Sequence, residues 1–287
     1  MKSFRFALVL SPVVFFLFSC KQKGAAPAAE KAPTKVNASS KEHFEKGNDY
    51  LFSDDLENAR KEYLASYEAD TTNWKAAYEL ASVLSLLGDF GNAHTFYNRT
   101  VELNPKFATG FYSKANLEEM VGDEKGSERS MRHALELKKD MYMAVLTLGR
   151  KEYAKKNYKM AIRYFDTAVS IRNDFYMVYN MRGSCKYSIG DVAGAIADFD
   201  QEIKLFPNHS RGYVNRAVAY GEQKNYRAAI NDLNEAINIE PLWSQGYIYR
   251  GLYYIKMNTK DSACGDFRMA YKLKNPDAEA YSKQYCQ

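Results

Sequence analysis

Apolar and polar residues recur along this 287-residue chain with a period of 34 residues. The segment KNYKMAIRYFDTAVSIRN begins at Lys156, and the similar segment KNYRAAINDLNEAINIEP begins at Lys224. A 34-residue frame fits seven times without an insertion, over residues 40–73, 74–107, 108–141, 142–175, 176–209, 210–243 and 244–277. Self-similarity at a fixed period of this length is the sequence signature of a repeat architecture.

Residues typical of helix starts and of helix ends predict a pair of helices in each repeat. Position 16 is always Asp, Asn or Thr, and these side chains accept hydrogen bonds from the N–H groups at a helix start, for about 1 kcal/mol each. Gly88, Gly122 and Gly190 come one residue earlier, where a preceding helix ends in a left-handed turn. Pro105 and Pro207 follow the second helix, because proline cannot continue it. Each repeat is therefore predicted to be helix, tight turn, helix.

Three further positions describe the contact between those two helices. Position 8 is always Gly or Ala, and position 20 is Ala or Ser. Small side chains at these positions allow the two helices to approach closely. Position 24 is always large and apolar, as at Tyr63, Phe165 and Phe267, and we expect it to fill the space beside the contact.

These positions together resemble the repeat of the tetratricopeptide repeat (TPR) family, and the resemblance covers residues 40–277. It implies an all-α fold, a TPR α-solenoid in which about seven helix-turn-helix pairs stack into a right-handed superhelix. In such a solenoid each repeat contacts only its neighbours. Residues 278–287 are then either a C-terminal capping helix or a tail.

Positions 7 and 23 change together from repeat to repeat. Opposite charges occupy them in four repeats, as Lys46/Glu62, Arg182/Asp198, Arg216/Asp232 and Arg250/Asp266. In the second repeat both residues are apolar, Leu80 and Phe96. We therefore expect the two side chains to touch across each helix pair. On this interpretation the three arginines are ion-pair partners rather than ligand-binding residues, and each pair contributes about 1 kcal/mol if it is partly exposed.

The first 39 residues differ from the repeats. Residues 1–19 combine Lys2 and Arg5 with an apolar segment that is too short to span a bilayer and is typical of a secretory signal peptide. The segment LFSC, which ends at Cys20, resembles the bacterial lipobox, so we expect Cys20 to carry lipid. The alternative is an ordinary signal peptide with an incidental Cys. Residues 20–39 are small, polar and rich in lysine, and are expected to be a flexible tether.

The charge of the chain argues against nucleic acid as a partner. Of the 40 Lys and Arg residues, six lie in residues 1–39, and of the 35 Asp and Glu residues, one does. The rest of the chain therefore holds 34 residues of each sign. Proteins that bind nucleic acid usually show a basic patch or stripe.

No catalytic or metal-binding motif is found in the sequence. The four His residues, His43, His94, His133 and His209, are far apart and lack the spacing of metal ligands. Phosphate loops, nucleophile elbows and HExxH motifs are also missing. No enzymatic activity, cofactor or metal is therefore expected.

Three cysteines remain besides Cys20, so at least one has no partner within the chain. A disulfide between Cys264 and Cys286 is feasible in an oxidising compartment. Without that bond they would be small apolar side chains, which is the role expected for Cys185.

In the TPR family, positions 2, 5, 9, 12 and 13 of the first helix line a concave face that binds partners. The resemblance therefore implies a partner-binding face made of Lys41, Phe44, Asn48, Lys75, Tyr78, Tyr112, Asn116, Arg150, Tyr153, Asn180, Tyr187 and Arg211. Asn can hydrogen-bond a peptide backbone in both directions, and Tyr offers flat apolar area with a polar tip. The expected ligand is an extended peptide or a partner helix. The alternative is that these are ordinary solvated or inter-repeat positions.

Together these features favour a protein–protein interaction adaptor or scaffold. We expect it to be exported, anchored by lipid to a bacterial envelope membrane, and facing the periplasm. The layout resembles that of the NlpI-type lipoproteins, which act as adaptors for envelope proteases and peptidoglycan enzymes. The alternative is a structural subunit of a larger envelope or secretion complex. A glycan-binding protein or an enzyme is the less favoured class.

The lipobox interpretation predicts the effect of Cys20→Ala. Cells fed a clickable fatty acid should label the native chain and leave the variant unlabelled, and the variant should leave the membrane fraction, because the acyl chains supply the anchor. Cys185→Ala is the matched control and should label like the native chain. Equal labelling of the native chain and Cys20→Ala would show that the cysteine at the cleavage site is incidental.

Overall fold

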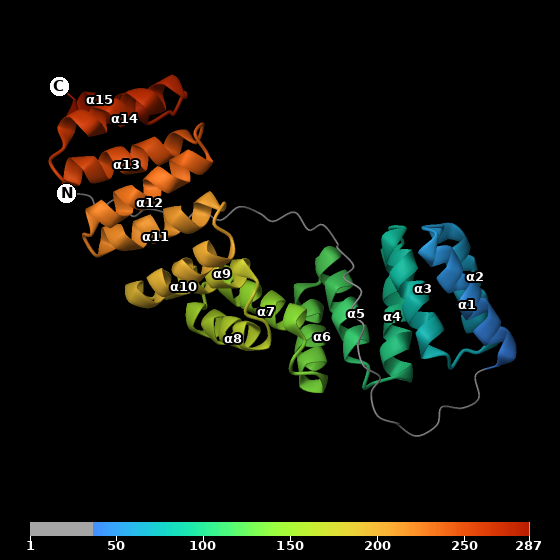
Figure 1. Cartoon of the computed structure of the whole chain (residues 1–287). Coiled ribbons are helices and arrows are strands. Elements are labelled where there is room, and N and C mark those ends of the chain that lie inside the picture. Colours follow the sequence, from blue (N-terminus) through green and yellow to red (C-terminus); the bar gives the residue numbers. More distant parts are fainter. Residues whose placement is uncertain (1–36, 287) are drawn as a thin grey trace. The chain divides into compact units, whose positions relative to one another are not determined.

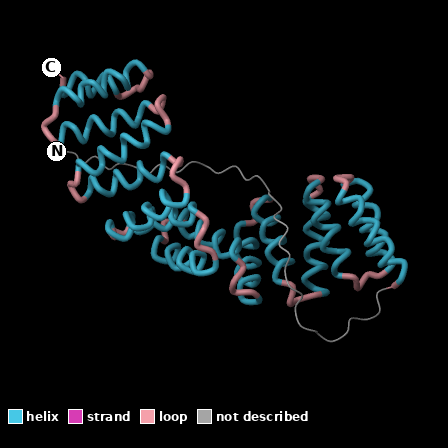
Figure 2. Tube along the Cα trace, in the orientation of Figure 1, coloured by secondary structure: helices cyan, strands magenta, loops and turns pink. Residues whose placement is uncertain are grey.

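The structure, a computed structural model, describes residues 37–286, and every regular element in them is an α-helix (Figures 1 and 2). This part of the chain contains fifteen helices and no strand, which confirms the predicted all-α fold of helix pairs. Residues 37–144 form one compact unit, the N-terminal unit, and residues 145–286 form the C-terminal unit. The predicted signal peptide and Cys20 lie outside the described residues.

The N-terminal unit contains three helix pairs. They are α1 (Ala38–Phe52) with α2 (Leu56–Ala69), α3 (Trp74–Leu86) with α4 (Phe90–Leu103), and α5 (Ala108–Met120) with α6 (Glu124–Leu137). The helices of each pair pack on each other, α2 packs on α3, and α4 packs on α5. Each pair therefore contacts only its neighbours, as expected for stacked repeats.

The C-terminal unit continues the same pattern. Helix α7 (Tyr142–Ala154) contains the division between the units. It is followed by α8 (Tyr158–Ile171), α9 (Tyr176–Ser188), α10 (Val192–Leu205), α11 (Ser210–Glu222), α12 (Tyr226–Ile239), α13 (Ser244–Lys256), α14 (Lys260–Lys272) and α15 (Ala278–Tyr285). None of the helices within residues 37–286 has the length and apolar composition that crossing a membrane requires.

The start of α1 corrects the predicted tether. The helix begins at Ala38, where the side chain of Asn37 accepts a hydrogen bond from the backbone N–H of Ser39 at 3.1 Å. The prediction that residues 20–39 are all tether is therefore wrong for its last two residues. The physical reason is the cap, since an Asn side chain satisfies an N–H group that the first turn leaves unpaired.

Most second helices begin with the predicted side-chain cap at position 16. The side chain accepts a hydrogen bond from the backbone N–H three residues later, at Asp55, Asp89, Asp123, Asp191 and Asn225. Asn157 and Thr259 make no such bond. Asn157 instead donates to Glu152, and the hydroxyl of Thr259 donates to the carbonyl of Tyr254.

Position 15 is left-handed in every repeat. Gly88, Gly122 and Gly190 have φ angles of 81°, 83° and 87° there, as predicted. Elsewhere a residue with a Cβ holds the same conformation, at φ between 59° and 62°, in Asp54, Lys156, Lys224 and Asn258. Because this costs roughly 1 kcal/mol or more for a residue other than Gly, the packing of the two helices must impose the turn.

The contact between positions 8 and 24 brings the helices of a pair together. A Cβ placed on Gly183 would lie 2.8 Å from the ring of Phe199, closer than atoms can approach. The same relation joins Gly47 to Tyr63, Gly149 to Phe165, and Gly251 to Phe267. All four rings are fully buried. The small residue is therefore required by the ring that it faces.

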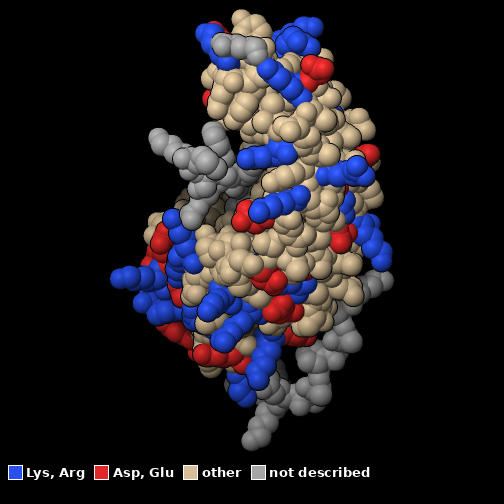
Figure 3. Space-filling view, turned by 90° about the vertical axis from the view of Figure 1, so that its left-hand side faces the viewer, with Lys and Arg blue, Asp and Glu red and all other residues tan. Residues whose placement is uncertain are grey.

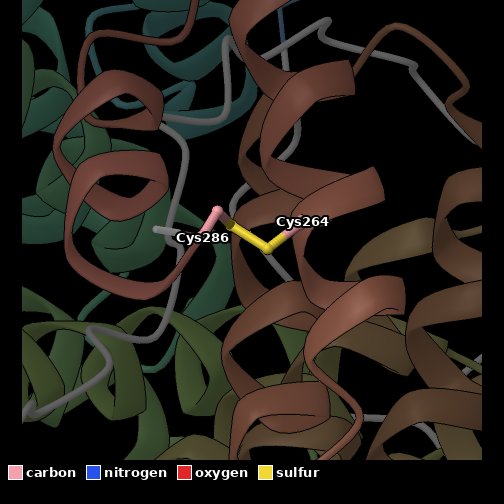
Figure 4. Close-up of a disulfide and its surroundings, with 2 residues drawn as sticks. All are labelled: Cys264 and Cys286. Atoms are coloured by element: carbon pink, nitrogen blue, oxygen red, sulfur yellow. A yellow bond between two sulfur atoms is a disulfide. The ribbon is translucent and has the colours of Figure 1, made fainter.

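Helix α15 packs its tyrosines on the core of the last repeat. The rings of Tyr281 and Tyr285 lie 5.6 Å and 6.2 Å from the ring of the fully buried Phe267. A disulfide joins Cys264, on α14, to Cys286, directly after α15, with the two Cα atoms 5.7 Å apart (Figure 4). The tail therefore covers the apolar end of the C-terminal unit and is tied to it covalently.

This arrangement predicts that Cys286→Ser loosens α15. The disulfide closes a segment with a sequence separation of 22 residues. Because it restricts the unfolded chain, it stabilises the folded state by about 3 kcal/mol. Backbone amides of α15 should exchange with solvent about 100-fold faster in the variant, as measured by hydrogen–deuterium exchange. Amides of α11 in the same sample provide the internal control. Unchanged exchange of α15 would mean that packing alone holds the helix.

Candidate interaction surface

An arginine at position 7 connects three helices of the C-terminal unit. The guanidinium of Arg216, on α11, donates two hydrogen bonds to Asp232 on α12, at 2.6 Å and 2.8 Å. It donates another to Asp200 on α10, at 2.6 Å. The bond to Asp232 confirms the predicted contact between positions 7 and 23. The bond to Asp200 also joins α11 to the preceding repeat. The joint change of positions 7 and 23 does not predict this second contact.

Two further arginines repeat this arrangement. Arg182 bonds Asp198 at 2.6 Å and 3.0 Å and Asp166 at 2.8 Å, and Arg250 bonds Asp266 at 2.6 Å and 2.9 Å and Asn234 at 2.8 Å. Each of the three guanidinium groups also lies 5.5 Å to 5.8 Å from the ring centre of the tyrosine three residues earlier. This is a cation–π distance.

The electrostatics of these clusters favour a structural role. The hydrogen bonds that Arg216 donates to Asp232 hold the pKa of Arg216 well above its usual value. Burial raises the pKa of Asp232, and the hydrogen bonds and charge of Arg216 oppose that shift. The donors of the guanidinium are directed at protein acceptors on both sides, so the arginine stabilises the stack of helices rather than offering its charge to a ligand.

The predicted ion pair between Lys46 and Glu62 is wrong. The ammonium of Lys46 bonds Glu42, one turn earlier on the same helix, at 2.8 Å. Glu62 bonds Nδ1 of His43 at 2.7 Å. Residues four apart on a helix are neighbours, and the flexible lysine lacks the planar fork that directs arginine toward a carboxylate.

Five predicted partner-binding residues of the N-terminal unit remain accessible. Lys41, Asn48 and Lys75 are exposed on the first helices α1 and α3, and Tyr112 and Asn116 are half-buried on α5. Burial raises the pKa of Tyr112, and a hydrogen bond with Asn116 opposes this shift. These side chains form an accessible polar and aromatic surface, the first-helix face.

Two other predicted residues of this unit mainly pack between helices. The ring of Phe44 lies 5.6 Å from that of Tyr63. The ring of Tyr78 lies 5.1 Å from that of Phe107, and its hydroxyl is 3.1 Å from the hydroxyl of Ser113 on the next first helix. These contacts favour the alternative interpretation from the sequence, in which such positions serve inter-repeat packing.

The prediction that Asn180 faces a partner is wrong. Its side chain is buried and donates a hydrogen bond to Glu202 at 2.8 Å. The carboxylate of Glu202 is fully buried and also bonds Nδ1 of His209 at 2.8 Å. A buried carboxylate needs hydrogen-bond donors, so Asn180 belongs to the interior.

The other predicted residues of the C-terminal unit are half-buried. Tyr153 packs against Tyr158 with the ring centres 5.5 Å apart, and burial raises its pKa to about 12. Tyr187 packs beside the cluster around Phe199. Arg150 and Arg211 lie near the two ends of first helices, Arg150 on α7 and Arg211 on α11.

A group of exposed apolar side chains was missed in the sequence. Phe52, Leu86 and Met120 are 83%, 56% and 65% exposed and end the first helices α1, α3 and α5. We call them the apolar stripe. All three occupy position 13, at intervals of 34 residues. The recurrence of a large apolar residue at this position could therefore have been found by aligning the repeats.

The described residues offer little for redox or metal chemistry. No group of three or more His, Cys, Asp or Glu side chains in them could hold a metal ion. Cys185 is buried, and burial raises the pKa of its thiol to about 12. The thiol is therefore protonated at neutral pH and a poor nucleophile.

Charged side chains of both signs share the visible surface. Figure 3 shows Lys and Arg among Asp and Glu on one face, with much uncharged surface between them. This mixture agrees with the equal numbers of basic and acidic residues outside the first 39.

Two sequence profiles match the chain, and both are described as tetratricopeptide repeat. One covers residues 44–106 and the other residues 210–241. No curated protein matches the sequence.

Several solved structures share the fold. The C-terminal part of a TPR repeat-containing protein from Cytophaga hutchinsonii matches with a TM-score of 0.70 and 16% identity, over 83% of this chain and 98% of that one. A TPR protein from Parabacteroides merdae matches with a TM-score of 0.57 and 18% identity, over 88% and 100%. YrrB, a TPR protein with an unusual peptide-binding site, matches with a TM-score of 0.58 and 22% identity, over 62% and 92%. At these identities the likeness concerns the fold alone.

The arginine clusters predict a large effect of Arg216→Leu. The change leaves the buried carboxylate of Asp232 without its main partner, and breaking a buried ion pair costs about 3 kcal/mol. The midpoint of urea unfolding, followed by circular dichroism, should fall clearly. Arg227→Leu, at an exposed position on α12, is the control and should shift it little. Equal midpoints for both variants would contradict a stabilising role for the cluster.

Proposed function

We propose that this chain, a tetratricopeptide repeat protein, is an adaptor that holds partner proteins at a bacterial envelope membrane. TPR proteins generally mediate protein–protein interactions, and the TPR fold is typically a non-enzymatic scaffold. The observation that carries the proposal is the first-helix face of the N-terminal unit, where similar accessible side chains recur on successive helices.

The recurrence follows the 34-residue period. Position 2 holds Lys41 and Lys75, position 9 holds Asn48 and Asn116, and Tyr112 lies at position 5. Lysine attracts carboxylates, the Asn amide matches a peptide backbone, and Tyr supplies flat area at little entropic cost. A protein surface of this kind suits a peptide or helix that runs across several repeats, which agrees with the peptide-binding site of the structurally similar YrrB.

The membrane part of the proposal rests on the N-terminal sequence. After export, Cys20 would become the lipid-bearing end of the mature chain, and two or more acyl chains anchor a protein stably. The lysine-rich tether that follows would let the repeats reach partners that lie near the membrane surface on its periplasmic side.

Crosslinking and affinity capture from intact membranes tests this function. The first bait is the full chain with a C-terminal tag, and the second carries Lys41→Ala, Lys75→Ala, Tyr112→Ala and Asn116→Ala. We expect the first bait to capture a specific set of proteins that the second loses. A third bait, with the exposed second-helix residues Lys61, Lys125 and Arg129 changed to Ala, is the matched control and should retain the set.

The outcomes separate the alternatives. Thermal unfolding of each bait checks that the substitutions leave the fold intact. Identical sets from all three baits, in fixed stoichiometry, would overturn the first-helix face and favour a structural subunit bound elsewhere. Capture of no specific protein by the first bait would overturn the adaptor function itself.

A further inference from the structure

Basic side chains gather at the turns of the C-terminal unit. We define the basic edge as positions 14–19 of its repeats, which are the turn between the two helices and the first three residues of the second helix. It comprises residues 155–160, 189–194, 223–228 and 257–262, with six basic and two acidic residues. Residues 145–286 as a whole contain 21 basic and 15 acidic residues. Most of the net positive charge of this unit therefore lies at the basic edge.

The N-terminal unit has the opposite charge at the same positions. Residues 53–58, 87–92 and 121–126 contain six acidic residues and one basic residue. The 34-residue pattern of the fold is the same in both units, so it does not require either sign at these positions. The charge of the turns is a property in which the two units differ.

The turns of the C-terminal unit lie along one edge of it. Arg182, Arg216 and Arg250 each bond the second helix of their own pair and that of the preceding pair in the same way. Successive repeats are therefore related by the same displacement, and equal positions form rows. Direct contact is seen between Tyr226, at the start of α12, and Tyr253 on α13, whose ring centres are 6.0 Å apart.

Four basic side chains of this edge are exposed and form no ion pair within residues 37–286. They are Lys156, Lys159, Lys224 and Arg227. Elsewhere in the unit basic side chains hold helices together, as Lys186 does by its bond to Asp198 at 2.8 Å. An exposed charge without a partner in the fold is accessible to an anion from outside.

Two of these lysines occupy a position where the fold does not favour lysine. Lys156 and Lys224 are left-handed, with φ angles of 61° and 59°. Gly adopts this conformation without strain, and Asn and Asp are the other residues that adopt it most readily. The remaining turns of the unit follow this preference, with Gly190 and Asn258. The fold alone therefore gives no reason for lysine at the two positions.

Apolar side chains lie among the basic ones. Ile189 and Met257, both at position 14, are 44% and 37% exposed. Exposed lysines with apolar side chains between them are typical of a surface that binds an anionic bilayer, because the lysines face the headgroups and the apolar groups enter the interface. Nucleic acid phosphates would attract the lysines but would leave the apolar side chains in water.

We propose that the basic edge docks the C-terminal unit on an anionic lipid surface. Lys156, Lys159 and Lys224 contact the headgroups, and Ile189 and Met257 enter the interface beside them. The acidic turns of the N-terminal unit are repelled by the same surface. This inference rests on the proposed location at an envelope membrane, and it adds a reversible contact of the repeats themselves to the lipid expected on Cys20.

Vesicle flotation tests the proposal with the chain from residue 20 onward that carries Cys20→Ala. This chain keeps every described residue and lacks the predicted signal peptide and lipid, so neither can insert into the vesicles. It should float with vesicles of phosphatidylcholine that contain phosphatidylglycerol and should not float with phosphatidylcholine alone. Binding should weaken as salt is raised, because exposed charges are screened.

The edge variant combines Lys156→Glu, Lys159→Glu and Lys224→Glu. Its binding to the anionic vesicles should weaken at least about tenfold, because each lysine near an anionic surface contributes to binding. Replacing Ile189 and Met257 by Ser should also weaken binding, since apolar area no longer enters the interface. Thermal unfolding of each variant checks that the fold is intact.

The matched control combines Lys204→Glu, Lys272→Glu and Lys274→Glu. These lysines are exposed on the same unit, but they lie at or directly after the far ends of the second helices α10 and α14. The control has the same net charge as the edge variant, and Lys274 is left-handed like Lys156 and Lys224. It should retain most of the binding.

Three results would overturn the inference. Equal losses in the edge variant and the control would show that net charge, and not this edge, determines binding. Equal flotation with both kinds of vesicle would exclude an anionic surface as the ligand. If duplex DNA or polyglutamate displaces the chain from the vesicles and the Ser variant binds like the unchanged chain, the edge binds polyanions and lipid is the wrong occupant. Partner capture through the first-helix face does not depend on any of these results, so the adaptor function is tested separately.

Discussion

The close packing of a small residue against a large, buried apolar side chain within each helix pair is the constraint on which this structure depends. At Gly183 the ring of Phe199 occupies the space that any Cβ would need. The contact sets the distance between the two helices and so fixes the path of the turn between them. It explains why the left-handed residue of that turn is tolerated even where it is Lys156 or Lys224. The burial of a large apolar side chain such as Phe165 or Leu233 is worth about 1.5–3 kcal/mol, which exceeds the local strain.

The arginine clusters add a polar connection between successive repeats. Aromatic contacts join the two helices of one pair, whereas Arg216 reaches both its own pair and the preceding helix α10. A planar guanidinium can satisfy two acceptors in different directions, which an ammonium cannot do with the same geometry. The N-terminal unit lacks these arginines at position 7 and has Lys46, Leu80 and Lys114 there. The two units therefore use the same frame with different interior chemistry.

This division of roles clarifies where function can reside. Residues such as Asn180 and Arg182 have the chemistry of binding residues, yet the interior already uses their hydrogen-bonding groups. Lys75, Leu86 and Met120 are exposed and Tyr112 is half-buried, so these side chains are accessible to a partner. A repeat protein can change such residues without changing its fold, since each repeat is stabilised by its own core and its neighbours.

The period, the helix pairs and the kinds of residue inside them can all be predicted from the amino-acid sequence. These features are local: a cap, a left-handed turn and a close contact each need a particular residue type at a particular position, such as Asp89, Gly88 or Gly183. The pairs of Arg and Asp could be predicted for the same reason, because both residues change together within one repeat.

The accessibility of the candidate residues, in contrast, depends on how the helices pack and cannot be predicted from residue types alone. Asn180 and Asn48 are both asparagines on first helices, but Asn180 donates a hydrogen bond to the buried carboxylate of Glu202 and Asn48 is exposed. Exposure depends on which side chains the packed helices bring together, as α10 brings Glu202 against Asn180 on α9 of the same repeat. The same holds for Phe52, whose apolar side chain would be assigned to the core by its type alone, yet it is 83% exposed at the end of α1.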